Sequence, residues 1–386
     1  MKKNFFLQLF TTVLILPSIA YSQIDSALTL NATYIGDFYS VINSKIDNSP
    51  GYLGLFLIGT EFSTEKLGLW KGGTFQLYGL NTHAETPTGS LVGDIQTFSN
   101  AENGDGTFIY QLAYQQEIGK LTVLAGVNDL AANFQSTGYG SLFTNSSFGV
   151  NPALSLNMPV SIFPKNALGL VLNYKFTDNL SAGVGFYDGN PGDFADDPYN
   201  TNWKLTSDEG VISIAELRYT KYFEEKIQTE YKIGAMYHNA DYASLTDASD
   251  TIISGNLAVY CTFDQDLFSI DNERHIACFG QFGFAQGSQN LVDLYGGFGL
   301  HIHGFLSKKG KGVLGVGVAY ASINDDVVKL NSPIIATNES ALEFTYKYDV
   351  TDKISLQPVF QYIINPGALT SVDNASVGMM RLNINL

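Results

Sequence analysis

Side chains that could carry out metal or nucleophilic chemistry are few and are not grouped in the sequence. His301 and His303 are two residues apart, a spacing that on a β-strand could bring both to one metal ion. No third ligand follows at a helpful spacing, so a polar lining of a water-filled interior is the simpler interpretation. The five histidines and the many serines include no G-x-S-x-G nucleophile motif. We therefore expect no catalytic residue, no metal and no bound cofactor.

Two cysteines, Cys261 and Cys278, fall on neighbouring predicted strands, both in the lipid-facing register. The hairpin between them is predicted to centre near Phe268 and Ser269, which would place the two thiols opposite each other. We hypothesise a disulfide, which the exported compartment permits. Two free thiols facing lipid are the alternative, and the change in mass on reduction distinguishes the two.

Four charged residues fall on the polar faces of predicted strands. They are Glu216, Arg218, Glu343 and Arg381. The third arginine of the chain, Arg274, falls in a predicted short turn instead. A Glu216–Arg218 pair could stiffen a barrel wall or contact a solute, and because ion pairs in water contribute little alone, both interpretations stay open.

The elements that must position these residues are β-strands, because apolar residues recur at every second position. Leu257, Val259, Cys261 and Phe263 alternate with Ala258, Tyr260 and Thr262. Similar alternation predicts about sixteen strands of nine or more residues, the length that crosses a bilayer at a tilt. Their predicted starts are Ser26, Gly51, Gly72, Thr107, Lys120, Pro164, Leu180, Gly210, Lys226, Thr251, His275, Asn290, Lys311, Glu339, Lys353 and Ala375.

Connections between these strands alternate in length. Short turns such as Thr177–Asn179 alternate with long loops at 84–106, 129–163, 189–209 and 323–338. Membrane barrels have short turns on the periplasmic side and long loops on the extracellular side, so this alternation is typical of them. Unpaired strand edges cannot be satisfied in lipid, so the sheet must close. The sequence predicts an all-β fold, a transmembrane antiparallel β-barrel of about sixteen strands.

The first residues have the pattern of a signal peptide. Lys2 and Lys3 precede an apolar stretch from Phe5 to Ile19 and the small-residue site at Ala20–Ser22. We expect a signal peptide at 1–22 and one barrel domain at 23–386. Charged residues make up 15% of the chain against about 25% in typical soluble domains, as suits a sheet with one face in lipid.

The net charge is −16, and loss of the two signal-peptide lysines would make it −18. With this charge we expect no nucleic-acid partner. The charge could aid solubility, or it could bias a pore towards cations and neutral solutes.

Five stretches, in this order, resemble the carbohydrate-selective porin (OprB) family. They are Leu91–Asp94, Asn145–Ser155, Phe186–Asp193, Val292–Tyr295 and Leu356–Gly367. The resemblance runs from about residue 50 to the C-terminus. It implies a sixteen-stranded barrel narrowed by inward-folded loops, through which mono- and small oligosaccharides diffuse.

By position, Asp129–Phe163 matches the constriction loop of that family. The resemblance and the polar strand faces together give a predicted sugar pathway of Asp94, Asp129, Asn133, Phe134, Tyr139, Asn145, Ser146, Asn151, Glu216, Arg218, Glu343 and Arg381. Asn and Ser are also ordinary loop formers. Family members line the pore with both basic and acidic side chains, and the scarcity of arginine here is a departure from that pattern.

The sequence thus predicts an outer-membrane porin of a Gram-negative bacterium for passive diffusion of small neutral sugars, in contact with outer-membrane lipid and compatible with a homo-oligomer. A general diffusion porin that weakly prefers cations is one alternative, motivated by the net charge. A barrel enzyme such as a phospholipase is another, and it would lose activity on substitution of one Ser or His.

Overall fold

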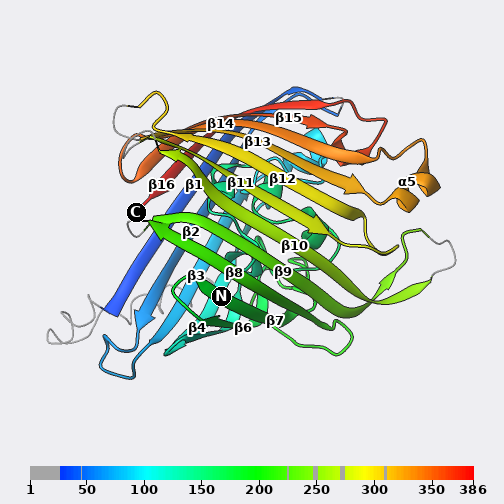
Figure 1. The fold of residues 1–386 in the computed structure, drawn as a ribbon. Coiled ribbons are helices and arrows are strands. Elements are labelled where there is room, and N and C mark those ends of the chain that lie inside the picture. The colour runs from blue at the N-terminus through cyan, green and yellow to red at the C-terminus, as the bar shows by residue number, and fades with distance from the viewer. Residues whose placement is uncertain (1–26, 45, 224–225, 247–250, 270–273, 308–310) are drawn as a thin grey trace, which may run out of the picture.

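Sixteen antiparallel strands close into a barrel in the described part of the chain (Figure 1). The computed structural model describes residues 27–44, 46–223, 226–246, 251–269, 274–307 and 311–386, so the predicted signal peptide and the predicted first residue of strand one, Ser26, lie outside it. Each strand pairs with its neighbours in sequence, and β16 pairs with β1. The predicted fold is confirmed, and the strands begin within three residues of the predicted starts.

The strands are β1 (Leu28–Asn43), β2 (Pro50–Ser63), β3 (Gly73–Ala84), β4 (Gly106–Ile118), β5 (Leu121–Asn128), β6 (Ala167–Lys175), β7 (Leu180–Asp188), β8 (Val211–Phe223), β9 (Lys226–Ala243), β10 (Ile252–Ser269), β11 (His275–Phe284), β12 (Val292–His303), β13 (Gly312–Ile323), β14 (Asn338–Asp349), β15 (Ile354–Ile364) and β16 (Ala375–Asn385). Short helical segments occupy the loops. They are η1 (Thr88–Val92), α3 (Leu130–Asn133), η2 (Tyr139–Leu142), η3 (Ser146–Phe148), α4 (Pro152–Ser155), α5 (Asp325–Asn331) and η4 (Pro366–Ala368).

Alternation of side chains between two environments explains why these segments form barrel strands. On β15 the inward residues Gln357 and Gln361 are buried in the lumen, whereas Leu356 and Phe360 are exposed on the outer face. A strand with a polar inner face and an apolar outer face is stable only between water and lipid. No helix in the described ranges is long and apolar enough to span a membrane.

Loop lengths follow the predicted pattern. Short connections such as 176–179 and 350–353 lie at one end of the barrel, and the long loops 85–105, 129–166, 189–210 and 324–337 lie at the other. Figure 1 shows the segment from 129 to 166, with its short helices, folded into the interior of the barrel. These inward segments, rather than the wall alone, determine the shape of the lumen.

The register of the β10–β11 hairpin corrects the predicted disulfide. Cys261 pairs with Phe282, whereas Cys278 pairs with Gln265, and both thiols are free. The cysteines are therefore four positions apart along the strands, roughly 13 Å, which exceeds the reach of a disulfide. A hairpin centre beyond Ser269 accounts for the shift, because Ser269 pairs with His275 and does not lie at the turn itself.

Candidate functional site

Residues 129–166, here called the constriction loop, begin with a capped helix. The Asp129 carboxylate accepts a hydrogen bond from the backbone N–H of Ala131 at 2.7 Å and so caps α3. The Tyr110 hydroxyl donates to the other carboxylate oxygen at 2.6 Å. Burial raises the pKa of Asp129, although these donors oppose the shift. The loop thus leaves β5 in a fixed direction, into the barrel.

Phe134 fixes the loop against the wall by close packing. Its side chain is fully buried. A Cβ added at Gly183 or Gly185 of β7 would lie 2.9 or 2.7 Å from the Phe134 ring, so only glycine leaves room for it. The ring fills the space between loop and wall and does not face solvent.

The Glu216 carboxylate of β8 forms the first polar anchor for this loop. It accepts hydrogen bonds from the backbone N–H of Gln135 at 2.7 Å and the Tyr260 hydroxyl at 2.9 Å. Arg218 donates to its other oxygen at 2.6 Å, and also to the backbone oxygen of Asn133 at 3.1 Å. The predicted Glu216–Arg218 pair therefore exists and is engaged by the loop.

Glu343 on β14 forms a second anchor on the opposite part of the wall. Its two carboxylate oxygens accept the backbone N–H groups of Thr144 and Asn145, each at 2.9 Å. The Asn145 side chain caps η3 by accepting from Ser147 N at 3.1 Å, and it donates to Gln361 at 3.2 Å. These groups are buried, so they hold the loop in place.

Asp264 on β10 forms a third anchor that the sequence prediction missed. It accepts the backbone N–H groups of Gly138 at 2.7 Å and Tyr139 at 2.9 Å. The Tyr139 hydroxyl donates to Asp266 on the same strand. Both aspartates lie on an alternating strand like many others, and no local sequence signal separates them as loop anchors.

A second inward loop, residues 85–105, is held by Glu339 at the start of β14. Its carboxylate accepts from the backbone N–H of Ile95 at 2.9 Å, Gln96 at 3.0 Å and Gly367 at 2.6 Å. Asp94 is buried beside it. Burial, followed by the nearby Glu339 charge, raises the pKa of Asp94 well above its usual value.

These four wall carboxylates share one task. Glu216, Asp264, Glu339 and Glu343 each accept backbone N–H groups from inward loops. A hydrogen bond to a charged group contributes about 1.5–3 kcal/mol, so the set fixes both loops firmly. Glu216 and Glu343, both predicted for the sugar pathway, are buried and accept backbone N–H groups from the constriction loop.

Between the two loops and the wall from β12 to β1 lies a cavity of about 940 Å³. That volume is near the upper end of small-molecule sites, which span roughly 300–1,000 Å³. Four predicted pathway residues line it: Asp129, Tyr139, Ser146 and Arg381. Eight do not: Asp94, Asn133, Phe134, Asn145, Asn151, Glu216, Arg218 and Glu343. Most of these eight are buried in loop or wall contacts, as Asn151 is at the start of α4.

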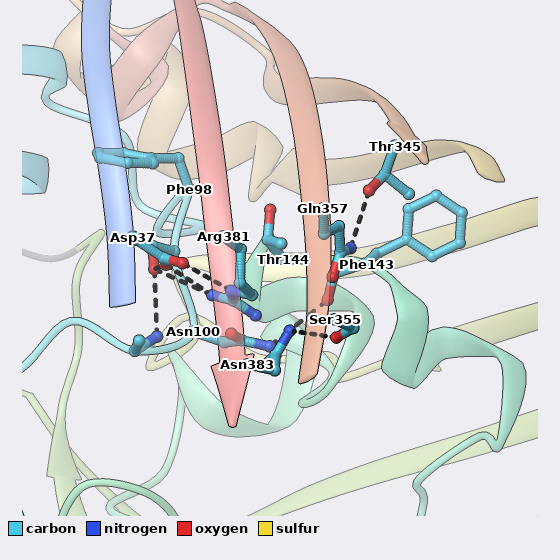
Figure 2. A network of polar contacts seen from close by, with 12 residues as sticks. Asp37, Phe98, Asn100, Phe143, Thr144, Thr345, Ser355, Gln357, Arg381 and Asn383 are labelled. Atoms are coloured by element: carbon cyan, nitrogen blue, oxygen red, sulfur yellow. Dashed lines mark hydrogen bonds and ion pairs between the residues drawn. The ribbon is translucent and has the colours of Figure 1, made fainter. Parts of the chain in front are cut away.

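Arg381 is bound to Asp37 across the seam of the barrel. Its Nε and Nη2 donate to the two Asp37 oxygens, each at 2.7 Å (Figure 2). Ser99 of the second loop donates to Asp37 at 2.6 Å. Both charged side chains are nearly fully buried. Bidentate geometry of this kind is strong and directional. The cation therefore contributes little free positive charge to the cavity.

Several uncharged cavity residues were missed by the sequence prediction. Asn100, Gln357, Asn383 and Asn385 all line it, and Figure 2 shows three of them near Arg381. The alternation of β16 places Asn383 and Asn385 on the inner face, so a signal for these two was present. Nothing local indicated that Asn100 would fold back to this position.

The histidines of the lumen form an aromatic group with the loop. The Tyr139 ring centroid lies 5.1 Å from that of His301 and 5.8 Å from that of His303, and His275 stacks on His303 at 3.9 Å. Among the described residues, no three His, Cys, Asp or Glu side chains are placed to hold a metal ion. The histidine rings stack on one another, with His301 and His275 each stacked against His303, whereas the Tyr139 ring is steeply inclined to His301 and His303.

Glu102 lines the cavity and is a carboxyl with a raised pKa. It accepts hydrogen bonds from the Thr88 backbone N–H at 3.0 Å and the Thr88 hydroxyl at 2.9 Å. Burial raises the pKa of Glu102 to about 7, although the Thr88 donors oppose the shift. This carboxyl can therefore change charge near neutral pH.

Comparisons with known proteins agree with this arrangement. The family model described as "Carbohydrate-selective porin, OprB family" matches residues 47–386. Porin B of Pseudomonas aeruginosa is 25% identical over 401 residues, covering 90% of this chain and 85% of that protein.

Solved structures share the fold. The high-pH structure of Pseudomonas putida OprB has a TM-score of 0.85 and 20% identity, with 96% of each chain covered. The channel DcaP of Acinetobacter baumannii has a TM-score of 0.57 and 9% identity, covering 93% of this chain and 97% of that one. The trimer form of OmpT of Vibrio cholerae has a TM-score of 0.53 and 10% identity, covering 93% and 99%.

Proposed function

This chain belongs to the carbohydrate-selective porin, OprB family, and is an outer-membrane sugar porin, not an enzyme. We propose that its pore favours neutral mono- and small oligosaccharides over charged solutes. Passage is passive, past the constriction loop and through the cavity beneath it, and uses no cofactor. Asp129, Tyr139, Ser146 and Arg381 are the predicted pathway residues that contribute to this route.

The observation that carries this proposal is the state of the charged groups along the cavity. Arg381 is bound to Asp37, and Asp129 is bound to Tyr110 and to the first turn of α3. Glu102 is bound to Thr88 and has a pKa near 7. Lys347, which also lines the cavity, lies 3.9 Å from Asp349 and is only weakly compensated. Because the other charges are compensated or partly neutralised, a solute meets mainly uncharged hydroxyl and amide groups.

Such a lining suits sugars for a physical reason. A sugar hydroxyl both donates and accepts hydrogen bonds, so it can exchange water for neutral amide and hydroxyl partners. Each exchange contributes only about 0.5–1.5 kcal/mol net. Binding of that strength favours entry without trapping the solute, which conduction requires.

Single-channel recording in planar bilayers tests the proposal. We expect millimolar monosaccharide to reduce the potassium chloride current reversibly, because sugar and ions share the constriction. An equally concentrated neutral polyol too large to enter serves as the control for viscosity. A current unaffected by sugar would support the alternative, a general diffusion porin with a weak cation preference suggested by the net charge of −16.

Export and membrane contacts complete the proposal. We propose cleavage after Ser22, so that the mature chain begins at Gln23, which intact mass measurement tests. The exposed outer-face residues, such as Leu112, Leu170 and Phe360, would contact outer-membrane lipid. A homo-oligomer is compatible with the trimer form known for a structural neighbour, OmpT.

A further inference from the structure

The inner face of the last two strands carries a row of polar side chains whose exposure increases along the cavity. Arg381, Asn383 and Asn385 follow one another at every second position of β16, and Gln357 lies beside them on β15. Residues two apart on a strand are separated by roughly 6.7 Å. Exposure increases in the same direction: Arg381 is buried, Asn383 is half-buried and Asn385 is exposed. The row thus leads from the buried ion pair towards the end with short turns.

The amides of this row are only partly used by the protein. Gln357 donates through Nε2 to the Leu142 backbone oxygen at 2.7 Å and to Thr345 at 2.8 Å. Asn383 donates through Nδ2 to Ser355 at 3.3 Å.

Asn385 accepts from Thr33 at 3.0 Å through Oδ1. Each amide has both donors and an acceptor. In the described structure the Oδ1 of Asn383 and the Nδ2 of Asn385 therefore keep hydrogen-bonding capacity directed to no protein partner.

Charged groups lie at both ends of this row. The Arg381 guanidinium is compensated by Asp37 at 2.7 Å. Lys347, which also lines the cavity, is partly exposed and lies 3.9 Å from Asp349. A solute that passes along β15 and β16 therefore meets neutral amides between the compensated Arg381 and a charged mouth. Asn385 lines that mouth together with Lys311, Lys347, Asp349, Asp352 and Lys353.

We propose that Gln357, Asn383 and Asn385 form a hydrogen-bonding track that guides neutral saccharides from the constriction to the periplasmic mouth. The inference rests on the proposed function and names specificity-determining residues for it. Sugar hydroxyls exchange bonds with successive amides, so the track favours saccharides over equally small solutes with fewer hydroxyls. Because each amide bonds weakly, the track speeds passage without retaining the solute.

Variants of the mature protein in liposomes test the track. The combined substitution Asn383→Leu and Asn385→Leu keeps side-chain size close to that of asparagine but removes the amides. The measurement is the ratio of swelling rates in an isosmotic monosaccharide and in a size-matched neutral amide, with potassium chloride conductance as the measure of pore size. We expect the ratio to fall roughly three-fold, as loss of one or two weak hydrogen bonds implies, and conductance to stay near the wild-type value.

Two controls separate the track from a structural role. Asn173→Leu replaces an asparagine on the inner face of β6 that does not line the cavity, and it should leave the ratio unchanged. Asn383→Gln retains an amide and should keep most of the preference. A Leu variant with normal conductance and an unchanged ratio, or an equal loss in Asn173→Leu, would overturn the track. Absence of any sugar preference in the wild type would instead overturn the proposed function, and the track with it.

Discussion

Arg381 of the last strand lies directly opposite Asp37 of the first strand and binds it through two hydrogen bonds of 2.7 Å. This ion pair joins the two ends of the barrel wall at the seam. Ser99 connects it to the second inward loop. One pair of side chains thus links barrel closure, loop position and the charge of the cavity.

Substitution of Arg381 should destabilise the barrel because it leaves Asp37 buried without its counter-charge. We expect Arg381→Met to lower the free energy of unfolding by about 3–5 kcal/mol. Urea titration followed by circular dichroism checks this value. The double variant Asp37→Leu/Arg381→Met should recover part of the loss, and a single-variant cost below about 1 kcal/mol, typical of an exposed pair, would contradict a structural seam.

Removal of charge from Glu343 should loosen the constriction loop. Glu343→Gln weakens the acceptor for the backbone N–H groups of Thr144 and Asn145. We expect faster hydrogen exchange at these two amides and larger fluctuations of the open-channel current. Glu61→Gln is the matched control, because this carboxylate on β2 accepts a hydrogen bond from the Tyr78 hydroxyl of the wall. Equal effects of the two variants would argue against specific anchoring.

Cation preference should depend on pH through Glu102. Burial raises its pKa to about 7, so the carboxyl is neutral below that pH and negative above it. We expect reversal potentials in a potassium chloride gradient to show greater cation selectivity at pH 8 than at pH 6. Glu102→Gln should remove this step, and persistence of the step in the variant would assign it to another group.

The cysteines should behave as two separate thiols. Cys261 and Cys278 are four positions apart in the hairpin register, and both are free. We expect the unfolded protein to take up two alkyl groups without prior reduction, as measured by intact mass. Alkylation that requires reduction would restore the disulfide hypothesis.

Sequence reasoning predicted the barrel well because its signal is local. Inward and outward residues alternate along each strand, as Gln357 and Leu356 do, and each strand carries this pattern independently. The pairing register between two strands depends less on local sequence than the strands themselves do. The β10–β11 turn is centred beyond Ser269, later in the chain than predicted, and the resulting register separates the two cysteines although both strands were predicted correctly.

The site was predicted only in part because its contacts are distant in sequence. Glu343 was assigned to the polar face of its strand, but its partner Thr144 is 199 residues away, and no periodicity indicates that pairing. Asp37 and Arg381 are 344 residues apart. Such contacts decide whether a lumenal charge meets a solute or holds a loop, and they depend on the folded chain.

Swelling of liposomes that contain the mature protein tests the central claim most directly. The rates are compared in isosmotic solutions of a neutral monosaccharide, a neutral disaccharide, a sugar acid and a size-matched amino acid. The account predicts that the monosaccharide enters faster than the sugar acid and the amino acid, and faster than the disaccharide. Entry ordered by size alone would contradict selectivity for neutral sugars, and absence of swelling would contradict an open pore.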